Sequence, residues 1–149
     1  MKCLSVSQPF ADLIISGKKT IELRNWNTNF RGEFLIHAPL KIKTEDCKRL
    51  KINKKFVTGV IIGKAELYDV KKYNSIKEIR EDQKFHFAAK KFQNKMYGFK
   101  IRNVKILKIP ILCKGQLGFF NVELTKIKNK DILSDIIDEE YRYQWINHH

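Results

Sequence analysis

Cysteine, proline, glycine and long apolar runs are all scarce in this sequence, and each scarcity excludes a class of protein. The 149 residues include 3 cysteines, 3 prolines and 7 glycines, and no proline-rich or glycine-rich linker divides the chain. Cys3, Cys47 and Cys113 lie far apart without a CxxC pair, which argues against a disulfide framework and a cysteine-bound metal. No apolar run approaches the roughly 20 residues that cross a bilayer, and the first residues lack the apolar core of a signal peptide.

From these absences we expect a cytoplasmic protein, a monomer, with no membrane segment, no metal centre and no cofactor. Histidine is scarce as well, with four in the chain. His148 and His149 end the sequence and resemble the stub of a purification tag. His37 and His86 are therefore the native candidates for histidine chemistry.

Acidic residues are outnumbered by basic ones. The chain has 16 aspartates and glutamates against 30 lysines and arginines, a net charge of +14 at pH 7. A field of this sign favours polyanions, with nucleic acid first and an anionic membrane surface second. Most of the bases are lysine, and asparagine and isoleucine are also frequent, a mixture that a biased nucleotide composition produces without any binding function. Charge alone leaves both interpretations open.

The apolar residues indicate a folded α+β domain. Hydrophobic residues make up 43% of the chain and include 10 phenylalanines, enough for a core. The patterns predict strands over 3–6, 20–24 and 33–38, a long bent strand over 56–70, a strand from Met96 that breaks near Pro110, and a last strand over 118–124. They predict a helix over 7–17, a short one after Thr44 as N-cap, one or two over 75–94, and one over 131–146.

About six strands with helices inserted between them predict a small mixed β-barrel, closed or nearly closed. A doubly wound parallel sheet is disfavoured, because the later strands follow one another without crossover helices. We expect residues 1–125 to form the domain, and 126–149 to add a C-terminal helix that packs on it or extends it. In the first helix, Ser7 or Gln8 is the expected cap, and Gly17 marks the end.

The stretch GKKTIELRNW, residues 17–26, carries a polar face inside an apolar strand. Alternation places Thr20, Glu22 and Arg24 on one face, with i and i+2 side chains about 6.5–7 Å apart. A guanidinium donates in a fork and a carboxylate accepts, so the pair suits the edge of a planar ligand such as a nucleobase. The alternative is a solvated face with an ordinary salt bridge, which contributes little to stability.

Other polar and aromatic residues have two interpretations each. Lys18 and Lys19 follow the first helix, where they either complement its dipole or act on a ligand as phosphate contact or base. Trp26 and Phe30, in the loop that contains Arg31, either stack on nucleic acid bases or cover the core. His37 ends the strand FLIHA, and a core histidine with satisfied hydrogen bonds is weighed there against a catalytic one.

Several of these pieces together resemble the ASCH domain of the PUA-like superfamily. They are LSVSQPFADLIISGKKTIELRNW, FRGEFLIHA, YGFKIRNVKIL with Pro110, and KGQLGFF, and they span about Leu4 to Asn121. The most specific are the Gln8–Pro9 pair, the block G-x-K-T-I-E-x-R, and R-G-x-x-x-I-H-A. The resemblance implies a small β-barrel with a helix between its first two strands and a cleft beside that helix. In such proteins the cleft is thought to bind RNA or a nucleobase.

By this resemblance, Lys19, Glu22, Arg24 and Gln8 line the cleft. The full set of candidate ligand-binding residues is Gln8, Pro9, Lys18, Lys19, Thr20, Glu22, Arg24, Trp26, Arg31 and His37. A bacterial branch of the family hydrolyses the acetyl amide of N4-acetylcytidine with a lysine, a threonine and a glutamate. Its lysine matches Lys19, but Glu22 stands where that branch has its threonine, so the expected nucleophile is missing.

The leading prediction is therefore a binding domain for RNA or a modified nucleobase. One alternative is a hydrolase or ribonuclease in which Lys19 is the general base and Glu22 its acid–base partner. A second is a protein-interaction module of the coactivator type that uses the C-terminal helix and Trp145. Amphipathic terminal helices usually pack on their own domain, which weighs against that second alternative.

Overall fold

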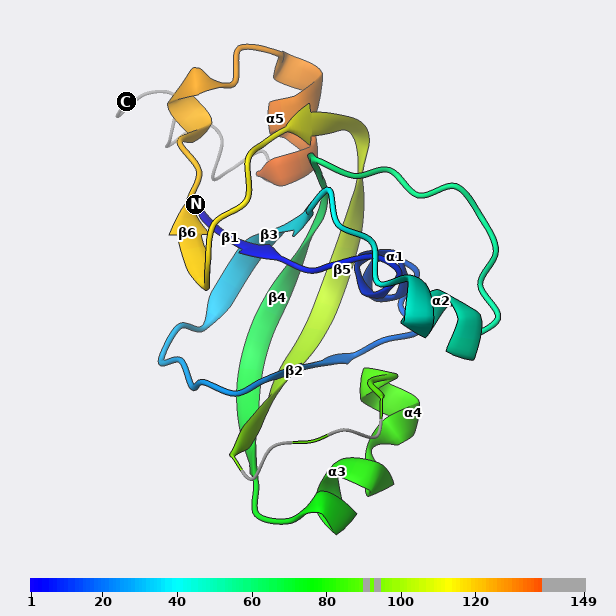
Figure 1. Ribbon diagram of the computed structural model, residues 1–149. Coiled ribbons are helices and arrows are strands. Elements are labelled where there is room, and N and C mark those ends of the chain that lie inside the picture. Colours follow the sequence, from blue (N-terminus) through cyan, green and yellow to red (C-terminus); the bar gives the residue numbers. More distant parts are fainter. Residues whose placement is uncertain (90–91, 93–94, 138–149) are drawn as a thin grey trace.

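The described residues form one strongly curved, mixed sheet of six strands. The structure is a computed structural model that describes residues 1–89, 92 and 95–137. The strands are β1 (Lys2–Ser5), β2 (Ile21–Arg24), β3 (Gly32–Ala38), β4 (Val60–Tyr73), β5 (Met96–Leu112) and β6 (Phe119–Asn121). Their order across the sheet is β2-β5-β4-β3-β1-β6 (Figure 1), and all neighbours are antiparallel except β1 and β3. The α+β class is confirmed.

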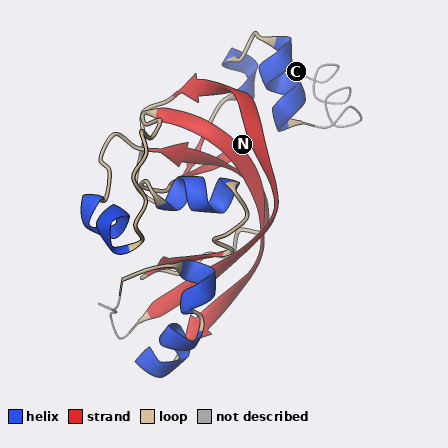
Figure 2. Ribbon diagram, turned by 90° about the vertical axis from the view of Figure 1, so that its right-hand side faces the viewer, coloured by secondary structure: helices blue, strands red, loops and turns tan. Residues whose placement is uncertain are grey.

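In the described part of the chain, five short helices and one 3-10 turn lie around this sheet. They are α1 (Phe10–Ile15), α2 (Thr44–Arg49), α3 (Ile76–Glu81), α4 (Gln83–His86), the 3-10 turn Leu124–Lys126, and α5 (Lys130–Ile136). In the side view the strands bend like an arc with α1 in the hollow and α5 at the outer side of one end (Figure 2). Among the residues described, no helix is long and apolar enough to cross a membrane.

Two apolar clusters hold these layers together. The larger one lies in the hollow, where Phe10 and Ile14 of α1 pack with Phe34, Ala65 and Phe99 of the sheet. The smaller one lies on the outer face and joins buried residues of β1, β3, β5 and β6 to α5; its members include Cys3, Leu35, Leu107, Phe120, Leu133 and Ile136. The position of α1 against the sheet is what creates the cleft described below.

The long strands β4 and β5 differ from the sequence prediction at two points. β4 starts at Val60, four residues after the predicted start at Phe56, and continues to Tyr73. β5 runs unbroken through Pro110, where a break was expected. β2 pairs only with residues 97–100 of β5, so Pro110 lies where that side of β5 has no neighbouring strand among the described residues. Proline's missing N–H is tolerated at such an edge.

The helix ends also correct the prediction in detail. Pro9 is the N-cap residue of α1, while Gln8 Oε1 accepts the N–H of Asp12 at 2.9 Å and so satisfies a free amide of the first turn. Lys43, and not Thr44, is the N-cap residue of α2, and it makes no side-chain cap. Gly17 ends α1 as predicted, with a φ of +81° that favours glycine.

β2 and β6 are the two edges of the described sheet, so strand pairing does not close a barrel. The curvature nevertheless brings the edges together, and side chains bridge them. Arg24 Nη2 donates to the carbonyl of Ser5 in β1 at 2.8 Å. The ring of Trp26 meets the ring of Phe119 in β6 edge to face, with centroids 5.9 Å apart.

The predicted C-terminal helix falls only partly within the described residues. α5 covers Lys130–Ile136 and packs on β5. The rest of that prediction, together with Trp145, His148 and His149, lies outside the described residues.

Candidate functional site

The turn after α1 sends one of two adjacent lysines into the protein. The left-handed Gly17 reverses the chain, and the Lys19 N–H then donates to the Leu13 carbonyl of α1 at 3.0 Å. The next residue, Thr20, donates to the Phe85 carbonyl of α4 at 2.9 Å, which fixes the start of β2 against that helix. As a result the Lys19 side chain is 2% exposed, whereas Lys18 beside it is exposed.

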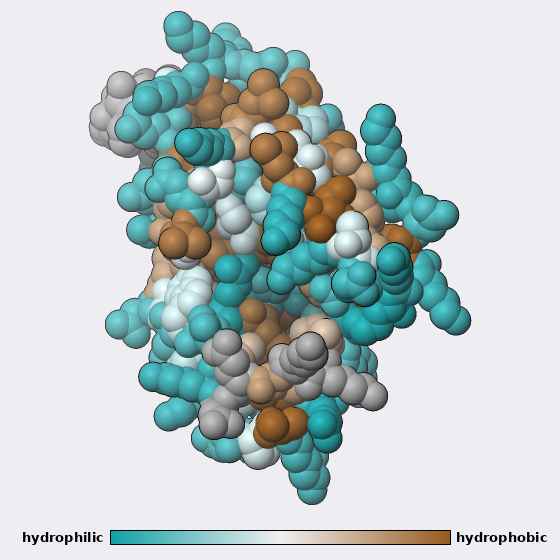
Figure 3. Space-filling model, viewed as in Figure 1, coloured by the Kyte–Doolittle hydropathy of each residue, from teal (hydrophilic) through white to brown (hydrophobic). Residues whose placement is uncertain are grey.

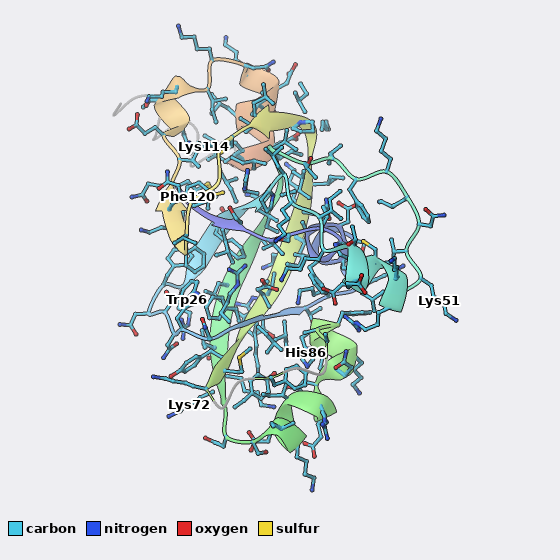
Figure 4. The ribbon with its side chains drawn as sticks, viewed as in Figure 1. Trp26, Lys51, Lys72, His86, Lys114 and Phe120 are labelled. Carbon is cyan, nitrogen blue, oxygen red and sulfur yellow. The ribbon has the colours of Figure 1, made fainter. Side chains whose placement is uncertain are left out.

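The Lys19 ammonium meets three oxygen acceptors. It donates to the Ile21 carbonyl at 2.6 Å and to the His86 carbonyl at 2.7 Å, and it pairs with Glu22 Oε1 at 3.0 Å. His86 is the last residue of α4 (Figure 4), where helix carbonyls have no partner within the helix. Lys19 Nζ also lies 5.3 Å from the centre of the Phe10 ring. Every N–H of the ammonium therefore has an acceptor.

Glu22 joins this lysine to Arg24. The carboxylate uses Oε1 for Lys19 and Oε2 for Arg24, which donates from Nε at 2.9 Å and from Nη2 at 2.7 Å. Arg24 Nη2 also reaches the Ser5 carbonyl. The three charged side chains thus form one connected row from the interior to the surface.

Burial and the neighbouring opposite charges shift the pKa values of Lys19 and Glu22 in opposite directions. Burial lowers the pKa of Lys19, and the carboxylate of Glu22 opposes that shift. Burial alone would raise the pKa of Glu22, but the adjacent Lys19 and Arg24 outweigh it and hold that pKa below its ordinary value. The three-acceptor geometry fits a charged ammonium, so the row carries Lys19 and Arg24 positive and Glu22 negative.

The outer end of this row opens into a small cleft between α1, β1, β2 and the start of α2. Its volume is about 210 Å³, and its lining is mainly polar. The residues that line it are Ser5, Val6, Ser7, Phe10, Glu22, Leu23, Arg24 and Lys43. Two predicted residues, Glu22 and Arg24, therefore line a common cleft, and Lys19 lies beneath them.

Four lining residues with polar or aromatic side chains were missed from the sequence: Ser5, Ser7, Phe10 and Lys43. Phe10 was counted as a core residue of α1, and its ring also faces the cleft. Lys43 comes from a distant part of the chain, and its N–H donates to the Gln8 carbonyl at 2.9 Å. The sequence around Lys43 shows only one more lysine in a basic segment, so it does not indicate that this residue lines the cleft.

Gln8 and Pro9 support α1 and do not line the cleft. Gln8 is fully buried and its Nε2 donates to Asp12 Oδ1 at 2.7 Å and to the Val57 carbonyl at 3.3 Å. Lys54 Nζ pairs with the other oxygen of Asp12 at 2.6 Å. These contacts fasten the segment between α2 and β4 to the helix.

The remaining predicted residues lie apart from the cleft. Arg31 is exposed, and its Nη1 donates to the carbonyls of Thr28 and Phe30 within its own loop. Trp26 packs edge to face on Phe99, with ring centroids 5.1 Å apart, so it covers the hollow of the sheet. Figure 4 shows Trp26 beside β2 and away from α1.

His37 belongs to a second cavity. It is 1% exposed, and the two nitrogens of its ring lie 2.8 Å from Ser5 Oγ and 2.7 Å from the Cys113 carbonyl. This cavity of about 690 Å³ is lined by Ser5, His37, Pro39, Leu40, Gly59 and residues 113–117. Burial lowers the pKa of His37, and its bond to the Cys113 carbonyl opposes that shift.

A curved mixed sheet with a helix in its hollow, and a polar cleft between that helix and β2, defines a PUA-like domain. Solved structures share this fold: an ASCH protein from Zymomonas mobilis has a TM-score of 0.63 and 16% identity, covering 89% of this chain and 93% of its own. Two single-substitution variants of that protein give the same TM-score and identity and cover 96% and 94% of their own chains.

The family model described as ASCH domain matches residues 4–108. The chain therefore belongs to the ASCH domain family, as its motifs suggested. A human relative, Activating signal cointegrator 1, is 29% identical over 127 residues, which is 72% of this chain. The chain spans 22% of the length of that relative.

Proposed function

We propose that this domain binds single-stranded RNA and holds one base, ordinary or modified, in the cleft beside α1. The observation that carries the proposal is the Glu22–Arg24 pair at the cleft wall. A guanidinium and a carboxylate side by side offer donors and acceptors to the edge of a base, and the Phe10 ring offers an apolar face.

The size of the cleft supports a single small group. Its 210 Å³ is below the roughly 300–1,000 Å³ of pockets that hold drug-sized ligands. A helix or a folded RNA element cannot enter such a space, whereas one unstacked base can. Recognition of RNA by sequence generally targets bases of this kind, in loops and single strands.

Lys43 at the mouth supports a phosphate contact next to the bound base. It is exposed and lines the cleft, and the chain continues from it through Arg49 and Lys51 at the end of α2 and beyond it. Lys51 appears at the right-hand edge of the molecule in Figure 4. A row of cations beside a base-sized cleft suits a strand whose backbone passes outside while one base turns inward.

The same geometry favours a role in recognition of the base over a role in proton transfer. A general base needs a free lone pair, and the Lys19 ammonium already donates to three oxygens. Glu22 is engaged by two cations, which lowers its pKa and weakens it as an acid. Lys19 and Glu22 therefore act in this proposal by holding Arg24 and the cleft wall in place.

Fluorescence anisotropy with a labelled 12-nucleotide single-stranded RNA tests the proposal. Arg24→Gln and Arg31→Gln remove the same charge, but only Arg24 lines the cleft. We expect Arg24→Gln to weaken binding about tenfold or more, as the loss of a charged hydrogen bond predicts, and Arg31→Gln to weaken it less than about threefold. Equal losses in two folded variants would contradict a role for the cleft.

A further inference from the structure

Ser5 and His37 form a hydrogen-bonded pair in the second cavity, and Ser5 also lines the proposed RNA cleft. His37 Nε2 lies 2.7 Å from the Cys113 carbonyl, which only accepts, so Nε2 carries the proton. Nδ1 then presents a lone pair, and Ser5 Oγ lies 2.8 Å from it. The serine hydroxyl must therefore donate to the imidazole. A serine that donates to a neutral histidine, itself oriented by a third group, is the arrangement of an activated nucleophile.

The pair opens onto a cavity and is not sealed in the core. Ser5 is partly exposed, and it lines the 690 Å³ cavity together with His37. Burial lowers the pKa of His37, which keeps the imidazole neutral and able to take a proton at physiological pH. A general base must lie within hydrogen-bond reach of the proton that it takes, and His37 Nδ1 lies 2.8 Å from Ser5 Oγ.

The loop over the pair supplies free backbone donors. A Cβ on Gly115 would lie 2.8 Å from both Ser5 Oγ and His37 Cε1, so the backbone itself covers the pair and no side chain fits between them. Within the described part of the chain, the N–H groups of residues 115–117 donate to no protein acceptor. The proposal assigns these N–H groups the role of donors to the oxyanion, a role that backbone N–H groups near a nucleophile commonly have.

The rim of the cavity indicates an apolar group as its occupant. Leu40 is 78% exposed and Leu117 is 99% exposed, and both line the cavity. Figure 3 shows hydrophobic side chains in the upper half of this face, and others in its lower part, among mostly hydrophilic ones, and Figure 4 labels Lys114 in the upper half. Such a site suits an ester whose acyl chain lies against the leucines.

We infer that Ser5 and His37 form a second site, in the cavity next to the RNA cleft, that hydrolyses carboxylic esters with short apolar acyl chains. Ser5 Oγ bonds to the ester carbonyl carbon while its proton passes to His37 Nδ1. The tetrahedral adduct then expels the alkoxide, which takes that proton from Nδ1 and leaves as the alcohol. Water attacks the acyl-serine with the same histidine as base, which releases the carboxylic acid and restores the serine.

The test combines turnover of p-nitrophenyl butyrate with labelling by a fluorophosphonate probe, followed by peptide mapping. We expect the wild-type chain to release p-nitrophenol over many turnovers and to carry the label on Ser5. Ser5→Ala is expected to abolish both signals, and His37→Gln to lower turnover about 100-fold. Ser134→Ala removes an exposed serine of α5 and is expected to behave as wild type.

Folding is checked by circular dichroism on every variant, because His37 also bonds the Cys113 carbonyl. Ser5→Cys retains a nucleophile beside the same base and is expected to react with iodoacetamide faster than a Ser5→Cys/His37→Gln chain does. The proposal is overturned if folded Ser5→Ala turns over the ester at the wild-type rate, or if the probe leaves wild-type Ser5 unlabelled.

Discussion

Lys19 Nζ and Glu22 Oε1 lie 3.0 Å apart in the interior. Glu22 lines the cleft, whereas Lys19 does not. The carboxylate is held from below by Lys19 and from the side by Arg24, so its position depends on both cations. In the proposed function, the motif that most resembles a catalytic one supports the surface that recognises the base.

Replacing Lys19 by methionine is expected to destabilise the fold. It leaves Glu22 buried with one cation instead of two and leaves the Ile21 and His86 carbonyls without their donor. Breaking a buried pair from one side costs about 3–5 kcal/mol, and the remaining Arg24 contact places this variant near the lower end. Urea unfolding measures it.

Lys18→Met is the matched control, because it removes the same charge from an exposed position next to Lys19. Its effect should stay within about 0.5 kcal/mol, as is usual for surface substitutions. Equal stability of the two variants would show that the buried ammonium does not support the site.

The buried His86 is expected to make stability depend on pH. Its Nε2 donates to the Ile79 carbonyl at 2.7 Å and its Nδ1 accepts the N–H of Ala88 at 3.0 Å, an arrangement that only the neutral ring can make. Burial lowers its pKa below the ordinary 6.5. The unfolded chain therefore binds more protons at His86 than the folded chain does. The contribution of the neutral ring to the free energy of unfolding is complete above about pH 6.5 and is lost as the pH falls.

Unfolding by urea at pH 7.5 and pH 5.5 measures this loss. The free energy of unfolding should fall between the two pH values in the wild type and fall less in His86→Gln, which has no group that titrates at that position. His37 contributes in the same direction, since its pKa is also lowered by burial. An unchanged pH dependence in a folded His86→Gln chain would contradict the neutral-ring account.

Charge reversal at Lys43 is expected to weaken RNA binding far more than reversal at Lys48. Both lysines are exposed residues at or within α2, but only Lys43 lines the cleft. Lys43→Glu should lower affinity about tenfold or more and reduce the slope of log affinity against log salt concentration, because one phosphate contact is lost. Lys48→Glu should change affinity less than about threefold, and anisotropy titrations at 50 and 200 mM salt compare them.

The local features of the site follow from the sequence because they depend on short-range rules. Strand alternation places Glu22 and Arg24 on one face, and a glycine at position 17 ends a helix by taking the left-handed conformation. Both predictions are confirmed in the structure. The same rules do not distinguish Lys18 from Lys19, because burial of one depends on α4, which lies more than sixty residues later.

Long-range contacts account for what the sequence did not predict. A hydrogen bond from the Lys43 N–H to the Gln8 carbonyl holds Lys43 at the cleft. His37 does not line the cleft and lies instead in a second cavity with residues 113–117. Pro110 stays within β5 because its neighbour on one side is absent from the described sheet. Each of these depends on contacts between distant parts of the chain, which local patterns do not encode.

The most direct test of the proposed function is an NMR titration of the ¹⁵N-labelled full chain with a short single-stranded RNA. The account predicts that the largest amide shifts occur at Ser7, Phe10, Leu23, Arg24 and Lys43, which line the cleft, and that these shifts shrink as salt is added. Largest shifts on the outer face of β4 and β5, with the cleft amides unmoved, would contradict it.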